Sequence, residues 1–184
     1  MKKLLTLLGL ALGLTISPNL SQAQETTPPA THKILIAYYS YSGNTAQAAK
    51  AIQQKIGGDL FAITSDHTYP QDYHEMVQQA KEEIAQNFRP ELTSSVKDIA
   101  QYDIVFIGSP NWWGTIAPQV SSFLEQYNLS GKTVIPFITH GGGGLQNTVS
   151  DLTAQCKGCQ IKPSWDGYQT SLQGLDDWLK SLKL

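Results

Sequence analysis

Hydrophobic positions follow two different periods along this chain, and together they predict alternating strands and helices. Several short runs are almost continuously apolar, as in strands that are buried on both faces of a sheet. Between these runs, apolar residues recur every three or four positions, which is typical of amphipathic helices. The expected strands are 33–39, 60–63, 104–107, 133–139 and a weaker 160–168.

An amphipathic segment follows each of these strands. Gly57 and Gly58 are expected to end the first helix, and the acidic residues of the second, Glu83 among them, are expected to form a solvated face. Pro163 lies inside the last strand and favours an edge position for it, because proline has no N–H to donate to a sheet. The expected helices are 46–56, 73–86, 120–127, 145–154 and 172–182.

This alternation predicts an α/β fold, in which a parallel sheet carries helices on both faces and right-handed crossovers join the strands. Ligands of such sheets bind beyond the carboxyl ends of the strands. The loops that follow the first, third and fourth strands should therefore converge at one edge of the sheet. These loops are 40–45, 110–116 and 140–144.

The first of these loops combines hydroxyl side chains with a glycine just before a helix. The unpaired N–H groups and the dipole of a helix N-terminus favour an anion, and the hydroxyls add donors. The loop has neither a nucleotide-binding lysine nor a dinucleotide glycine motif, so it indicates a single phosphate monoester, with an ordinary polar turn as the alternative. Its candidate residues are Ser40, Ser42, Gly43, Asn44 and Thr45.

The other two loops carry two adjacent tryptophans and a run of glycines. Consecutive side chains point to different sides, so Trp112 or Trp113 should contact solvent or a ligand. An exposed indole beside a phosphate site favours a flat aromatic ligand, although one core and one surface tryptophan would also explain the pair. The four glycines after His140 can bring backbone groups close to a ring edge, or they form a flexible loop. Together the three loops describe a site for FMN.

The N-terminus has a basic start, an apolar run and small residues before a cleavage point, which is typical of a secretory signal peptide. The apolar run is too short to span a membrane. We expect a signal peptide at 1–23, a flexible lead at 24–31 and one domain at 32–184, exported to a periplasm or secreted, with no membrane anchor after cleavage. The net charge of −2 argues against a nucleic-acid partner. The sequence leaves the oligomeric state open.

The two cysteines of the chain, Cys156 and Cys159, form a C-x-x-C motif. In an exported protein we expect them to be oxidised to each other, although this spacing also suits thiol–disulfide exchange. They follow the fourth predicted helix, so they should lie at the amino ends of the strands, a strand length away from the FMN site. A structural disulfide is therefore favoured over an electron relay. Two close ligands with no histidine nearby do not predict a metal site.

The phosphate loop and the tryptophan loop together resemble the flavodoxin family, and the resemblance covers 32–184. The second loop is closest to a bacterial flavodoxin-like branch that reads Gly-x-Pro-x-Trp-Trp-Gly-Thr. The resemblance implies a doubly wound, five-stranded parallel sheet of order 2-1-3-4-5 in three α/β/α layers, with FMN at the switch point. Carried over by position, the FMN-binding residues are Ser40, Ser42, Gly43, Asn44, Thr45, Pro110, Asn111, Trp112, Trp113, Gly114, Thr139, His140, Gly141, Gly142 and Gly143.

One departure from this family concerns the third loop, where typical flavodoxins place a tyrosine as the outer stacking partner of the flavin. This chain has glycines there. One face of the flavin is therefore expected to be open, or to be closed by Tyr69 or Tyr73. An open face would admit a small substrate or the cofactor of a partner protein.

The leading hypothesis is an exported FMN protein that carries electrons between redox partner proteins or to a small-molecule acceptor, with the flavin supplying the chemistry. The rival is an NAD(P)H-dependent quinone or small-molecule reductase on the same fold, although no nicotinamide motif is recognisable. In that case His140 is the candidate proton donor, while a loop histidine that only packs is the commoner role. A binding protein that has lost FMN is a third possibility, which the intact phosphate loop disfavours.

Overall fold

The computed structural model of this protein describes residues 32–184. The predicted signal peptide (1–23) and lead (24–31) lie outside the described residues and stay predictions. The strands are β1 Ile34–Tyr38, β2 Asp59–Ala62, β3 Ile104–Trp112, β4 Thr115–Ile116, β5 Thr133–His140, β6 Gln160–Ile161 and β7 Trp165–Tyr168. The α-helices are α1 Asn44–Ile56, α2 Tyr73–Ala85, α3 Pro118–Gln126, α4 Thr148–Gln155 and α5 Leu175–Leu182, and a short 3-10 helix, η1, covers Ile99–Gln101.

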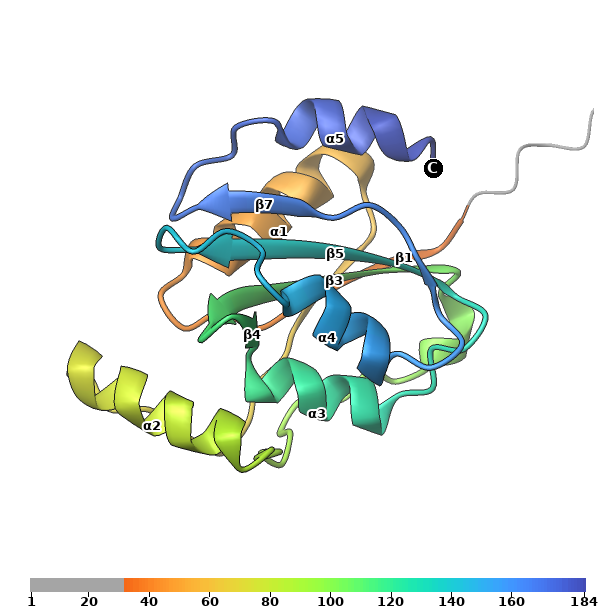
Figure 1. Cartoon of the computed structure of the whole chain (residues 1–184). Coiled ribbons are helices and arrows are strands. Elements are labelled where there is room, and N and C mark those ends of the chain that lie inside the picture. Colours follow the sequence, from red (N-terminus) through yellow and green to blue (C-terminus); the bar gives the residue numbers. More distant parts are fainter. Residues whose placement is uncertain (1–31) are drawn as a thin grey trace, which may run out of the picture. The chain divides into compact units, whose positions relative to one another are not determined.

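The main sheet is parallel and runs in the order β2-β1-β3-β5-β6, with β7 also pairing β5 (Figure 1). β6 and β7 together occupy the place of the fifth predicted strand. Counted in that way, the order is the predicted 2-1-3-4-5, and the predicted flavodoxin-like fold class is confirmed. The crossovers place the carboxyl ends of β1, β3 and β5 side by side.

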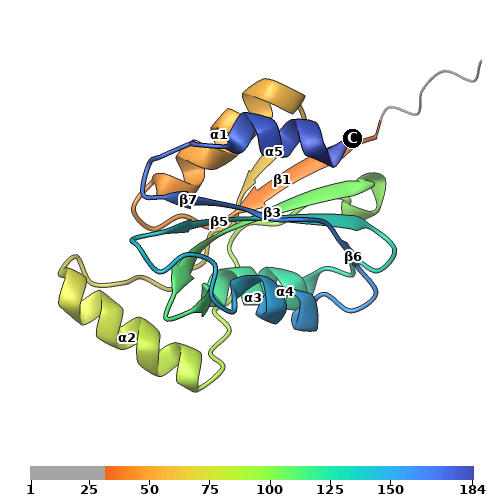
Figure 2. The ribbon, with the colours of Figure 1, turned by 45° about the horizontal axis from the view of Figure 1, so that its top comes forward.

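Helices cover both faces of the sheet, with α1 and α5 on one side and α3 and α4 on the other (Figure 2). The strand residues alternate between two hydrophobic cores, since successive side chains of a strand point to opposite faces. Leu35, Val105 and Val134 belong to the core beneath α3 and α4. Ile36 and Phe106 belong to the core beneath α1 and α5. The almost continuous apolar runs of the sequence therefore reflect burial on both faces.

Two elements differ from the prediction in a way that shapes the site. β3 extends to Trp112 and turns back as the short strand β4, so the second predicted loop is mostly a β-hairpin. Its two-residue turn, Trp113 and Gly114, has φ values of 53° and 85°, as in a type I′ turn. Apolar periodicity did not predict this extension, because the last residues of β3 are only partly buried and do not form a continuous apolar run.

The fifth predicted strand is divided into β6 and β7, and both pieces pair only with β5. Pro163 lies in the gap between them, which agrees with the missing N–H of proline and with the predicted edge position.

Helix α2 begins at Tyr73 because Asp72 accepts hydrogen bonds from the backbone N–H groups of His74 (2.9 Å) and Glu75 (3.0 Å). It does not cover the sheet like the other helices. Figures 1 and 2 show it beside the carboxyl ends of the strands, where its residues Met76 and Ala80 form a separate small core. The β2–α2–β3 crossover therefore adds a wall to the edge at which a ligand is expected.

Candidate functional site

The first and third predicted loops meet through two buried threonine side chains. Oγ1 of Thr45, at the start of α1, lies 2.8 Å from Oγ1 of Thr139, at the end of β5. Both residues are almost completely buried. Either hydroxyl can be the donor of this bond, and the contact joins the first and third loops.

The second and third loops are joined by the side chain of Asn111. Its Nδ2 donates to the carbonyl oxygen of Gly144 (2.6 Å), and its Oδ1 accepts from the backbone N–H of Gly114 (2.9 Å). The backbone N–H of Asn147 also donates to the carbonyl of Gly114 (2.9 Å). All three predicted loops therefore converge on one edge of the sheet.

The phosphate loop has unused donors in the described structure. The hydroxyl oxygen of Ser40 is buried and has no hydrogen-bond partner. No side chain caps the N-terminus of α1, and no acidic residue lies in its first turn. A buried hydroxyl without a partner is costly, and an uncapped N-terminus of a 13-residue helix attracts anions. These groups fit a phosphate, with Ser42, Gly43 and Asn44 exposed or half-buried around it.

Trp112 and Trp113 diverge, as predicted. Trp112 is half-buried and packs edge-on against Tyr39, Tyr41 and Tyr69, with ring centroids 5.7, 6.0 and 4.9 Å away. Trp113 is 53% exposed, yet its indole N–H donates to a backbone carbonyl of α2 (2.9 Å), and the ammonium of Lys81 lies 4.8 Å from its ring centroid. The hairpin and α2 thus form one aromatic wall at this edge of the sheet.

A hydrogen-bonded network behind this wall was not predicted. Glu83 accepts from the Tyr69 hydroxyl (2.6 Å) and from Gln79 (2.7 Å), and it lies 2.7 Å from Nε2 of His67. Its side chain is only 13% exposed, so the prediction of a solvated position was wrong. Because α2 packs against the hairpin instead of the sheet, its buried stripe includes this carboxylate, which helical periodicity alone could not show.

The two tyrosines of the wall remain neutral hydroxyls at physiological pH. Burial raises the pKa of Tyr69 well above its ordinary value, and the hydrogen bond to Glu83 raises it further. Burial likewise raises the pKa of Tyr39, with a smaller contribution from nearby Tyr41. In this protonated state Tyr69 donates its hydroxyl proton to Glu83.

His140 is held at both ring nitrogens. Its Nδ1 accepts from the backbone N–H of Gly142 (3.1 Å), and its Nε2 lies 3.0 Å from Oδ2 of Asp166. Nδ1 must therefore be the unprotonated nitrogen, and Nε2–H donates to the carboxylate. In this arrangement His140 shapes the glycine loop and has no free N–H to give to a substrate. Asp166, on β7, was missed because only the strand pairing brings it beside His140.

Part of the third loop lies open, although a Cβ at Gly143 would lie 3.2 Å from Nε2 of Gln146. Adding a Cβ to Gly141 would meet no atom within 4 Å, and at Gly142 only the ring of Tyr168 would lie at that distance. Tyr168 is 52% exposed and its ring centroid is 6.1 Å from that of His140. Tyr168 is therefore a further exposed tyrosine beside the glycine loop, whereas Tyr69, one of the two tyrosines predicted to close the open flavin face, is buried in the wall.

The base of the hairpin is fixed by Ser109. The hydroxyl of this buried residue donates to the carbonyl of Pro110 (2.8 Å) and accepts from the N–H of Ala117 (2.9 Å), just before α3. Pro110 and Asn111 are thereby held between the sheet and α3. Within residues 32–184 there is no cluster of acidic, histidine or cysteine side chains that could hold a metal ion, and no helix there is long and apolar enough to cross a membrane.

We expect Thr45→Val to lower the free energy of unfolding by about 1–3 kcal/mol, because it leaves the buried Thr139 hydroxyl without a partner. The double variant Thr45→Val/Thr139→Val should lose less than the sum of the two single variants, since it removes both polar groups. Urea unfolding of the four proteins measures this coupling. Strictly additive losses would contradict a direct contact between the two loops.

The comparisons with known proteins agree with this geometry. The crystal structure of a Bacteroides eggerthii protein, provisionally named a flavoprotein, is 32% identical, has a TM-score of 0.75, and the alignment covers 83% of this chain and 99% of that one. The crystal structure of a Lactobacillus acidophilus flavoprotein in complex with FMN is 27% identical with a TM-score of 0.68, covering 80% of this chain and 99% of that one.

A curated relative extends the comparison to enzymes. An NAD(P)H dehydrogenase (quinone) of Cupriavidus metallidurans is 30% identical over 95 residues, which are 51% of this chain and 46% of the relative. The matched region thus spans about half the length of that relative. A family model described as flavodoxin matches residues 33–182, which is nearly the whole described domain. This chain belongs to the flavodoxin family.

Proposed function

We propose that this protein binds FMN at the crevice between its three loops and acts as an exported electron carrier. The observation that carries the proposal is the unpartnered Ser40 hydroxyl beside the uncapped N-terminus of α1. A phosphate monoester would satisfy both. Trp112 and the aromatic wall would flank the flavin ring, and the backbone of Gly141 to Gly143 would meet its other side. The bound flavin would accept and release one or two electrons.

The exposed aromatic side chains around the proposed FMN site favour transient contact with a redox partner. Four of the five large apolar side chains that are most exposed in residues 32–184 lie on the elements that surround this site: Tyr41, Tyr73, Trp113 and Tyr168. Exposed aromatic residues are common at protein contacts, and redox encounters are typically small and short-lived. Electrons could thus pass at this surface to a partner protein or to a small acceptor.

The proposal is tested by purifying the protein with added FMN. We expect a bound flavin spectrum and quenching of FMN fluorescence at micromolar concentration. Riboflavin, which lacks the phosphate, should bind more weakly. If FMN at micromolar concentration neither co-purifies nor is quenched, the proposed cofactor is wrong. Sequencing the N-terminus of the protein from its natural host tests export, which requires that the chain no longer begins at Met1.

A second candidate function is an NAD(P)H-dependent quinone or small-molecule reductase. The match to the Cupriavidus metallidurans quinone dehydrogenase favours it, and the open third loop offers room above the flavin. Turnover of NADPH with a quinone would support the enzyme, whereas reduction only by a protein donor would support the carrier. The described geometry gives His140 a positioning role in either case.

We expect Asp166→Ala to weaken FMN binding by roughly threefold to tenfold, the scale of one lost hydrogen bond. Without the carboxylate, the His140 ring can change tautomer and release the N–H of Gly142, which loosens the loop. Titration of FMN into the apoprotein measures the effect, and imidazole nitrogen chemical shifts report the tautomer. Asp177→Asn, on the exposed face of α5, is the matched control. Equal affinities for both variants would refute a positioning role of Asp166.

A further inference from the structure

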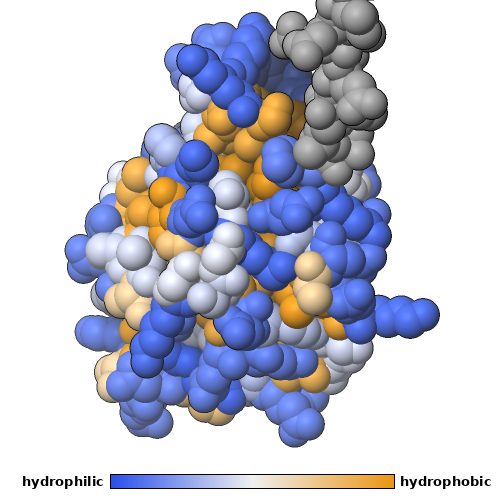
Figure 3. All heavy atoms as spheres, turned by 90° about the vertical axis from the view of Figure 1, so that its right-hand side faces the viewer, coloured by the Kyte–Doolittle hydropathy of each residue, from blue (hydrophilic) through white to orange (hydrophobic). Residues whose placement is uncertain are grey.

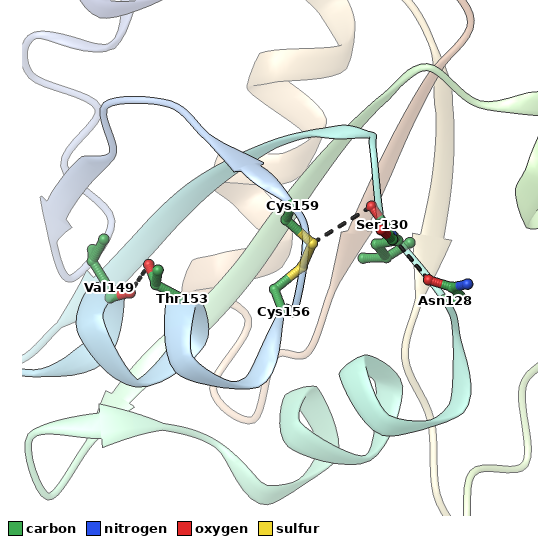
Figure 4. Close-up of a disulfide and its surroundings, with 7 residues drawn as sticks. Asn128, Ser130, Val149, Thr153, Cys156 and Cys159 are labelled. Carbon is green, nitrogen blue, oxygen red and sulfur yellow. Dashed lines mark hydrogen bonds between the residues drawn. A yellow bond between two sulfur atoms is a disulfide. The ribbon is translucent and has the colours of Figure 1, made fainter.

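The chain carries a second redox-capable group at the opposite end of the sheet. Cys156, at the C-terminal end of α4, forms a disulfide with Cys159, just before β6. Figure 4 shows this bond between the end of the helix and the turn that precedes β5. The two sulfur atoms are unequally placed, since Cys156 is 6% exposed and Cys159 is only half-buried. Both cysteines line the hollow described below, but Cys159 offers an attacking group the larger exposed surface.

The bond contributes little to the stability of the fold. The stabilising effect of a disulfide grows with the length of the loop that it closes, and these cysteines are only three positions apart. The segment is also held by backbone hydrogen bonds, from Gly131 N–H to the Gly158 carbonyl and from Gln160 N–H to the Lys132 carbonyl, both 2.9 Å. Opening the disulfide should therefore leave the local structure in place.

The surroundings are suited to the reduced form as well. Sγ of Cys159 lies 3.5 Å from the carbonyl oxygen of Leu129. A disulfide sulfur has no proton to donate to that oxygen, whereas a thiol is a weak donor. The carbonyl therefore gains a hydrogen bond when the pair is reduced. This contact distinguishes the site from a disulfide surrounded only by apolar side chains.

The disulfide borders a surface hollow of about 500 Å³ that lies between the ends of α3 and α4. This volume falls within the range of small-molecule sites. Its lining includes the cations Arg89 and Lys157, one carboxylate, Glu125, and the apolar Leu124, so the cations outnumber the acidic side chain. Arg89 is only loosely paired, with Glu125 at 3.8 Å. Figure 3 views the face at which the parallel strands begin and shows it as mostly hydrophilic around a smaller hydrophobic patch, so a polar ligand suits this end of the molecule.

We propose that this hollow binds a small, carboxylate-bearing thiol that exchanges with the Cys156–Cys159 disulfide. The thiolate attacks Sγ of Cys159, the Cys156–Cys159 bond breaks, and Cys156 leaves as a thiolate that takes up a proton. A second thiolate attacks the mixed disulfide and releases the small molecule as its own disulfide, while Cys159 is left as a thiol. Two small thiols are thus oxidised, and one protein disulfide is reduced by two electrons.

Trapping the mixed disulfide tests which sulfur reacts. Oxidised glutathione is the probe, with mass spectrometry as the readout. We expect Cys156→Ser to form an adduct at Cys159 at least tenfold faster than Cys159→Ser forms one at Cys156, because the remaining thiol of the latter is buried. Equal rates in both variants, with circular dichroism showing both to be folded, would overturn the assignment. If either variant unfolds, differential alkylation of partially reduced wild-type protein must label Cys159 first, or the assignment fails.

The anion preference is tested on the wild-type disulfide. We expect reduced glutathione to open it roughly fivefold faster than 2-mercaptoethanol after correction for thiolate fraction and intrinsic reactivity, the scale of one or two exposed ion pairs. Arg89→Gln and Lys157→Gln should each remove part of this advantage. Lys162→Gln, which lines a different hollow, should not. Equal corrected rates, or faster reduction by thioredoxin than by glutathione on the same basis, would overturn the small-thiol assignment.

This site does not depend on the FMN proposal. The disulfide lies at the amino ends of the strands, and the crevice lies at their carboxyl ends. We expect the exchange rate to be the same in the apoprotein and in the FMN-loaded protein, and the double variant Cys156→Ser/Cys159→Ser to keep its FMN affinity. An exchange rate that changes with FMN loading would contradict the independence of the two sites.

Discussion

Ser40→Ala should weaken FMN binding by roughly 10-fold to 100-fold, since a hydrogen bond to a charged group contributes about 1.5–3 kcal/mol. The same change should leave the apoprotein as stable as before, or raise its free energy of unfolding by up to about 1 kcal/mol, because it removes a buried hydroxyl that has no partner. A loss of FMN affinity without a loss of folding stability would show that the Ser40 hydroxyl serves ligand binding and not the fold.

Two controls make this prediction specific. Riboflavin lacks the phosphate, so its affinity should be almost unchanged by Ser40→Ala. Ser122, on α3, also has a buried hydroxyl without a partner, but it lies in the middle of a helix away from the phosphate loop. Ser122→Ala should affect stability in the same direction and leave FMN affinity unchanged. Fluorescence titration and urea unfolding measure both quantities. An equal loss of affinity for FMN and riboflavin would contradict a phosphate contact at Ser40.

The parallel α/β class and the edge at which the loops meet could be predicted from sequence because burial on both faces leaves continuous apolar runs, whereas the order of the strands was implied by the resemblance to the flavodoxin family. Ile36 and Phe106 face one core while Leu35 and Val105 face the other, so β1 and the first part of β3 are apolar at successive positions. Parallel strands also require crossovers, which bring their carboxyl ends to one edge. Both arguments use local patterns, and they were sufficient for the fold class but not for the order of the strands.

The walls of the site could not be predicted in the same way. Asp166 reaches His140 only through the pairing of β5 with β7. Glu83 lies on an amphipathic helix whose buried stripe faces the hairpin, and the sequence alone favours a solvated position for a carboxylate. The αL conformation of Trp113 is unusual for a bulky residue. Such features depend on contacts between segments that are distant in the sequence, and the periodicity of apolar residues within one segment cannot predict them.

Gly108 belongs to the motif that resembles the flavodoxin family, but its surroundings show that it serves packing of the core. Of the motif Gly-x-Pro-x-Trp-Trp-Gly-Thr, only Pro110 to Gly114 were predicted to bind FMN, and Gly108 lies on β3 directly beside Phe137 of β5. A Cβ at Gly108 would lie 2.2 Å from Cζ of the Phe137 ring, and Phe137 is completely buried. The glycine is thus required by packing, since the aromatic ring covers its backbone.

We therefore expect Gly108→Ala to lower the free energy of unfolding by about 3 kcal/mol or more, at the upper end for an overpacked core. Phe137→Leu should offset part of this loss, so the double variant is more stable than the sum of the single changes predicts. Gly141→Ala, with an open surrounding and no positive φ, should stay within about 0.5 kcal/mol of the parent protein. Urea unfolding of the apoproteins decides the matter. Equal stabilities of Gly108→Ala and Gly141→Ala would contradict this prediction. They would mean that the Phe137 ring can move aside freely and that the core between the sheet and α1 is loosely packed at this point.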